Sequence, residues 1–175
     1  MIHNVALLFD IFSFTGWIET TALSVWVRES PSLWAFPFVL ILHTVGMGFL
    51  VGTNIALDLR VLGFAPRVPL SLFEKFFFVM KIAFFINAIS GLLLLIAYPT
   101  KALTNPLFYL KLTLIAFGLA QTWMILNQVI RKPFVEMKGI PAKAKVVAAT
   151  SLVVWAGGVT SGRLLAYTYK HLLAG

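Results

Sequence analysis

Four long apolar stretches constrain this chain most, because each is close to the ~20 residues that a helix needs to cross the ~30 Å apolar core of a bilayer. The chain has 175 residues, of which 60% are hydrophobic and only 11% are charged. An average soluble domain carries about 25% charged residues. The sequence therefore predicts an all-α membrane protein built as a four-transmembrane-helix bundle. The predicted spans are residues 33–57, 76–98, 107–130 and 146–169.

Turn-forming residues separate these spans and leave no room for a second domain. Pro99 ends the second span, and Asn105-Pro106 is a typical helix start with proline in the first turn. The connecting loops are short, so a single compact bundle is expected. The predicted organisation is an N-terminal segment over residues 1–30 and the bundle over residues 31–175.

A weaker apolar segment over residues 5–27 precedes the spans. It contains Asp10 and Glu19, and a fifth spanning helix would bury both acids. A pair of short amphipathic helices at the interface, with Trp17 and Trp26 at headgroup depth, costs less. The sequence therefore favours the interfacial helices, with a fifth span as the alternative.

The charge pattern predicts the orientation in the membrane. The net charge is +8, and the basic residues lie in short loops between apolar runs, which fits anionic lipid headgroups and argues against nucleic acid. Eight cations are expected on one side and three on the other, so the richer side is predicted to be cytoplasmic and the C-terminus outward. The eight are Arg60, Arg67, Lys75, Arg131, Lys132, Lys138, Lys143 and Lys145; the three are Arg28, Lys101 and Lys170.

Three cationic or titratable side chains lie inside the spans: His43, Lys111 and Arg163. A charge at such a depth costs about 2.5–3.5 kcal/mol on insertion scales, so such residues commonly mark a functional site. With ~1.5 Å of rise per residue, all three fall in the outward half of the membrane. Asn54 shares a helix face with His43, and Tyr167 shares one with Arg163. These five residues are the predicted ligand-binding candidates.

Each candidate also has a structural interpretation. His43 is equally compatible with a neutral imidazole bonded to a neighbouring helix. Lys111 lies within reach of the interface through its long stem. Arg163 keeps its proton and needs an acceptor. Glu19 or Asp10 would supply one if the N-terminal segment folds against the outer mouth, and helix C-terminal carbonyls or a bound anion are the alternatives.

A second group of charges is predicted near the cytoplasmic ends of the first two spans. Asp58, Arg60, Lys75 and Lys81 form the expected structural charge cluster, in which Lys81 pairs with Asp58 or Glu74. This interpretation assigns these residues to folding rather than to chemistry.

Small residues recur at every fourth position on the first and fourth spans. Such ladders allow helix backbones to approach closely, and tight helix packing is the expected role. Room for a flat ring, such as a porphyrin or a quinone, is the alternative. The ladders are Thr44-x3-Gly48-x3-Gly52-x3-Ala56 and Gly158-x3-Gly162-x3-Ala166.

Three stretches resemble the pattern HxxG…DLRLLG…GRxIAY of a family of small bacterial multi-pass inner-membrane proteins that has no assigned activity. They are residues 42–46 (LHTVG), 57–63 (LDLRVLG) and 162–167 (GRLLAY), and Arg28-Glu29-Ser30 also fits. The resemblance covers nearly the whole chain after about Trp17. It implies a bacterial inner-membrane protein, distantly similar in layout to small cytochrome-b-like proteins. It marks His43, Asp58, Arg60 and Arg163 as signature positions.

The favoured function is a small membrane subunit accessory to an electron-transfer complex, with a polar site that contacts haem b or quinone. His43 is the candidate ligand of the haem iron. A bis-histidine haem needs a second histidine, and only His171 and His3 remain, unless Met47 or Met124 serves instead.

A transporter component and an enzyme are the alternative functions. A component of a proton or small-anion transporter would use His43, Lys111 and Arg163 as its site, although four helices without an inverted repeat make a small transporter. An enzyme is disfavoured, because no serine–histidine–acid set, metal cluster or acidic pair occurs within the spans and cysteine is absent. We therefore expect no catalytic activity of its own, and assembly with itself or with other membrane subunits.

Overall fold

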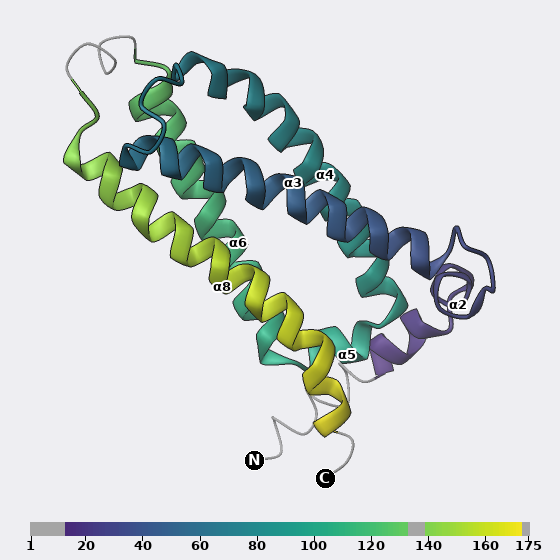
Figure 1. Ribbon diagram of the computed structural model, residues 1–175. Coiled ribbons are helices and arrows are strands. Elements are labelled where there is room, and N and C mark those ends of the chain that lie inside the picture. Colours follow the sequence, from purple (N-terminus) through teal and green to yellow (C-terminus); the bar gives the residue numbers. More distant parts are fainter. Residues whose placement is uncertain (1–12, 133–138, 173–175) are drawn as a thin grey trace, which may run out of the picture.

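The computed structural model describes residues 13–132 and 139–172, with the backbone alone at residue 166 and at residues 169–172 (Figure 1). This part of the chain is helical without a strand, and four of its helices are long and apolar enough to cross a membrane. The predicted all-α membrane bundle is therefore confirmed. The long helices are α3 (Phe36–Leu62), α4 (Ser71–Ala97), α6 (Pro106–Ile125), continued by the π-helix η1 (Leu126–Ile130), and α8 (Ala142–Leu172).

Helices α3, α4 and α8 are longer than their predicted spans, because polar residues next to each apolar run also belong to the helix. α3 continues to Leu62, where Gly63 closes it in the left-handed conformation with φ 110°. Asp58 and Arg60 therefore lie inside this helix and not after it. α6 begins where Asn105-Pro106 predicted, because the Asn105 side chain accepts a hydrogen bond from the Leu107 amide.

Figure 1 shows α3 lying between α4 and α8, while α6 packs along α8. Two ends of the bundle can be distinguished. The loop end is where residues 63–70 join α3 to α4, and the α2 end carries the short helices α2 (Ala22–Glu29) and α5 (Pro99–Leu103). Both α3 and α6 run from the α2 end towards the loop end.

Two groups of buried side chains form the apolar core. One lies towards the loop end and the other in the middle, where Trp155 is 1% exposed. The Trp155 ring fits because a Cβ built on Gly118 of α6 would stand 2.9 Å from it, so only glycine leaves the necessary space. The first group is Leu57, Val61, Leu70, Phe73, Ile125, Val129, Ala144 and Ala148; the second is Leu50, Val51, Met80, Ala83 and Trp155.

The described part of the N-terminal segment forms two short helices, over residues 13–19 and in α2, and not a spanning helix. α2 packs across the end of α4, where Ser24 Oγ and Arg28 Nη1 donate to the Ala97 carbonyl at 3.5 and 3.4 Å. Trp17 and Trp26 are 65% and 46% exposed, as expected for helices that lie at an interface. Residues 5–12 lie outside the described part.

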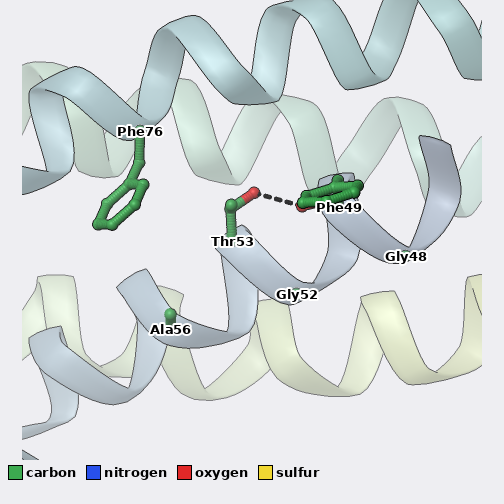
Figure 2. Close-up of a pocket in the computed structure, with 6 residues that line it drawn as sticks. All are labelled: Gly48, Phe49, Gly52, Thr53, Ala56 and Phe76. Carbon is green, nitrogen blue, oxygen red and sulfur yellow. Dashed lines mark hydrogen bonds between the residues drawn. The ribbon is translucent and has the colours of Figure 1, made fainter. Parts of the chain in front are cut away.

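The two glycines of the small-residue ladder of α3, Gly48 and Gly52, pack against no other described helix of this chain. A Cβ built on Gly48 or Gly52 would have no neighbour within 4 Å. Figure 2 shows these glycines beside Thr53, Ala56 and the rings of Phe49 and Phe76, which line a shallow groove on the outer surface. The ladder of α8 is different, because Gly158 and Gly162 face Leu114 and Lys111 of α6.

Candidate functional site

His43 and Lys111 meet between three helices. The Lys111 ammonium nitrogen of α6 lies 3.2 Å from His43 Nε2 on α3. On the other side of the ring, His43 Nδ1 lies 3.1 Å from the Asn87 carbonyl oxygen and 3.3 Å from Ser90 Oγ, both on α4. We call these four residues the His43–Lys111 site. The structure thus brings together two of the three deep cationic or titratable candidates.

The hydrogen bonds of His43 determine which ring nitrogen carries the proton. A lysine ammonium only donates, so Nε2 must accept from Lys111. Nδ1 must then carry the hydrogen that it donates to the Asn87 carbonyl. The imidazole is therefore neutral, with one fixed tautomer, as long as the lysine is charged.

Glycines on the facing helices make room for the site. A Cβ on Gly91 would lie 3.0 Å from Cε1 of the His43 ring, and one on Gly162 would lie 3.4 Å from the Lys111 stem. Gly46 brings the backbones of α3 and α4 together, and Asn87 Nδ2 donates to the His43 carbonyl oxygen at 2.7 Å. The backbones are thus held close enough for a side chain on one helix to reach a carbonyl on the other.

The depths of the two residues agree with their contact. His43 lies six residues before the middle of α3 (Phe36–Leu62), or ~9 Å towards the α2 end. Lys111 lies seven residues before the middle of the helical run from Pro106 to Ile130, or ~10 Å towards the same end. The predicted first span, residues 33–57, begins and ends earlier than α3 does, so its middle lies closer to His43 than the middle of α3.

Lys111 has no carboxylate partner in the part of the chain that the structure describes. The ion pair present there joins Arg28 to Glu29 at 2.9 Å, beyond the end of the bundle. Glu19 accepts from the Thr100 amide at 3.3 Å and so contacts the start of α5. Lys111 therefore brings a positive charge into the bundle that its hydrogen bond to a neutral imidazole does not balance.

Arg163 and Tyr167 lie apart from this site. The Arg163 guanidinium is 5.9 Å from the centre of the Tyr167 ring, which confirms that the two share a helix face. That face points away from the bundle, since Arg163 is exposed and Tyr167 is 59% exposed. Glu19 contacts α5, and Asp10 lies outside the described residues, so the ion pair considered for Arg163 is not seen within them.

Asn54 also belongs elsewhere in the structure. It is 1% exposed, accepts from the Thr122 hydroxyl of α6 and donates to the Leu50 carbonyl at 2.7 Å. These bonds place it in the core, about three helical turns from His43 along α3.

The four residues of the expected charge cluster are not brought together. Asp58 is 1% exposed and has no ion pair among the described residues. Arg60 turns towards the following loop and donates to the Val68 and Pro66 carbonyls at 2.6 and 3.1 Å. Lys75 and Lys81 are both exposed on α4.

Sequence reasoning did not single out Asn87 and Ser90 as site residues. A signal for them exists, because Asn87, Ser90 and Gly91 stand at i, i+3 and i+4 and form a small polar face on an otherwise apolar span. That face is the one α4 turns towards His43.

The site offers hydrogen-bond donors and one imidazole, but it does not resemble a metal centre. Within the described residues, no group of three or more histidine, cysteine, aspartate or glutamate side chains is placed to hold a metal ion. The polar groups suit an acceptor ligand, either an anion or a carbonyl oxygen. No family model matches the chain, and no curated protein or solved structure is significantly similar to it.

Proposed function

We propose that this chain is a small integral membrane subunit, accessory to an electron-transfer complex and without catalytic activity of its own, whose His43–Lys111 site contacts a quinone. The observation that carries the proposal is the Lys111 ammonium, which lies between helices, 3.2 Å from a neutral His43 and without a carboxylate partner in the described part. One of its three N–H groups serves His43, which leaves donors for a ligand oxygen.

A quinone carbonyl matches this site in both polarity and location. The carbonyl oxygen accepts hydrogen bonds, while the ring and its apolar tail belong in the membrane. Reduction of a quinone also takes up two protons with two electrons. Lys111 and His43 form a hydrogen-bonded pair that would deliver protons, and the partner complex would supply the electrons.

Haem is supported less well than quinone. His43 would have to give up the bond between Nε2 and Lys111 before it could bind iron. The second histidine would have to be His3, outside the described residues, or His171, whose side chain lies outside them.

A proton or small-anion transporter component is the second candidate. The unbalanced positive charge of Lys111 favours it, because an anion is the simplest partner for a half-buried cation between helices. Arg163 does not belong to this version of the site, since it faces away from the bundle.

We expect Lys111→Met to weaken quinone binding about 10- to 100-fold, because a hydrogen bond from a charged donor contributes about 1.5–3 kcal/mol. The assay would titrate short-chain benzoquinone and naphthoquinone into the protein in lipid nanodiscs and follow tryptophan quenching. Lys81→Met is the matched control, because Lys81 is an exposed lysine on a different helix and its variant should bind like the wild type.

Other results would redirect the proposal. Equal quinone affinity in the wild type and in Lys111→Met would overturn the quinone site. A chloride or proton flux in liposomes that needs Lys111, without quinone binding, would favour the transporter. A reduced b-type absorption band that is lost in His43→Ala would instead make this a haem protein.

We also propose the orientation and surroundings expected from the basic loops. The chain lies in a bacterial inner membrane with the loop end in the cytoplasm and the C-terminus outward. Arg60, Arg67, Pro66 and Gly139 line a hollow at that end, where basic side chains suit anionic lipid headgroups. The exposed groove on α3 is consistent with assembly into a complex or a homo-oligomer.

A further inference from the structure

Four buried polar side-chain atoms have no hydrogen-bond partner in the described part of the chain. They come from α3, α6 and α8, and their residues are between 0 and 6% exposed. A polar atom buried without a partner costs free energy, so a group of them requires an explanation. The atoms are Asp58 Oδ2, Gln121 Oε1, Ser151 Oγ and Trp155 Nε1.

The contacts of Asp58, Ser151 and Gln121 place these three residues in the half of the bundle towards the loop end, and Trp155 lies one helical turn nearer the middle. Ser151 of α8 lies beside the Asp58 carboxyl. Gln121 Nε2 donates to Thr150, the neighbour of Ser151, at 2.8 Å. Trp155 follows Ser151 by one helical turn on the same face. Three of the four atoms without partners are oxygens, and one of these belongs to a carboxyl group.

The charged side chains of the elements around Asp58 do not balance it. Arg60, on the same helix, is bonded to the carbonyls of Val68 and Pro66. Arg131, which follows η1, is exposed and donates to Asn127 at 3.1 Å. Lys111 of α6 is bonded to His43. The other charged side chains that the structure describes on the neighbouring helices are exposed, and the residues packed around Leu57 are apolar. Those exposed groups are Glu74, Lys75 and Lys81 of α4 and Lys143, Lys145 and Arg163 of α8.

An ionised carboxylate at 1% exposure, with neither a cation nor a full set of hydrogen bonds, is not a stable arrangement in a bilayer. We propose that Asp58, Ser151 and Gln121 form a buried binding site for one monovalent cation, either a proton or Na⁺. Oxygen atoms are the ligands that hard cations prefer, and the site offers a carboxyl, a hydroxyl and an amide oxygen. Trp155 Nε1 lies against Gly118 of α6 and is not one of the proposed ligands.

This site is separate from the His43–Lys111 site and does not depend on the proposed function. Asp58 lies fifteen residues after His43 on α3, or ~22 Å along the helix axis. It is four residues from the end of α3, so an ion from the aqueous phase at the loop end would have a short path to it.

Because Asp10 and Asp58 are the only aspartates in the sequence, ¹³C labelling of aspartate carboxyl groups gives two signals to assign. Infrared spectra of the full-length protein in nanodiscs at neutral pH, without Na⁺, would show whether each group is an acid or a carboxylate. Asp58→Asn and Asp10→Asn assign the bands. A second measurement compares thermal unfolding in NaCl with unfolding in choline chloride at equal ionic strength.

A labelled carboxylic-acid band that is lost in Asp58→Asn would support a bound proton. A carboxylate band, together with a Na⁺-dependent rise in the unfolding midpoint that is lost in Asp58→Asn and reduced in Ser151→Ala, would support Na⁺. A carboxylate band with no Na⁺ dependence would overturn the site. Helix content and elution volume of Asp58→Asn establish that the variant is folded, and asparagine keeps the side-chain shape.

Discussion

Gly46→Leu should destabilise the bundle by about 3 kcal/mol or more, the upper range for an overpacked core. A Cβ built on Gly46 lies 3.0 Å from the Asn87 backbone nitrogen and 3.1 Å from the Ala83 carbonyl oxygen. These are backbone atoms of α4, which cannot turn away as a flexible side chain does. The larger side chain should therefore force α3 and α4 apart, and with them His43 and Asn87.

Gly48→Leu is the matched control, because a Cβ on Gly48 meets nothing within 4 Å. Leucine also favours a helix over glycine by up to ~1 kcal/mol, so the control should be as stable as the wild type or slightly more so. Unfolding in mixed detergent micelles, followed by the loss of helical circular dichroism, gives the difference in unfolding free energy. Equal stability of the two variants would contradict the close approach of α3 and α4.

The second large effect is expected for Trp155→Ala, which should cost about 3 kcal/mol of unfolding free energy. The Trp155 ring is 1% exposed and packs with Leu50, Met80 and Ala83 and against Gly118. Its removal leaves a cavity between the four long helices, and the lost contacts matter in a membrane as they do in water. This value is at the low end of the range for aromatic residues. In the unfolded state the side chain still contacts lipid or detergent, so moving it out of the core costs less free energy than moving it into water.

Trp123 provides the comparison for this prediction. It is the same residue type on α6, but it is 66% exposed, so Trp123→Ala should change the unfolding free energy little. The same micelle titration measures both variants. If Trp123→Ala proved as costly as Trp155→Ala, the assigned core would be incorrect.

The sequence predicted the four spans well, because length and hydropathy decide which segments can cross a membrane. The ends of the helices were predicted less accurately. The first span was expected to stop at residue 57, since Asp58 and Arg60 lower the hydropathy, yet α3 continues to Leu62. The π-helical segment Leu126–Ile130 was also not predicted, because its residues are ordinary for an α-helix.

The candidate site was predicted in part. Depth counting put His43 and Lys111 in the same half of the membrane, and the structure shows them bonded. Depth counting does not show which face each helix turns towards the bundle. Arg163 and Asn54 were therefore included in the predicted site, although they lie elsewhere in the structure. Facing directions are set by packing between helices, and four spans of nearly uniform hydrophobicity carry a weak signal for it.

The glycine ladder of α3 illustrates the same limit. Gly48 and Gly52 looked suited to packing, whereas Gly46, outside the ladder, makes the close contact with α4. The four-residue spacing correctly predicted that these residues share one face of α3. It did not show that this face points away from the other helices of the chain.

The open groove beside Gly48 and Gly52 has a practical consequence (Figure 2). The chain contains no cysteine, so a cysteine introduced at either position is a unique attachment point for a spin label. With nothing within 4 Å of either position, the label need not disturb the bundle. Its accessibility to oxygen dissolved in the lipid would then report whether this face meets acyl chains or another polypeptide.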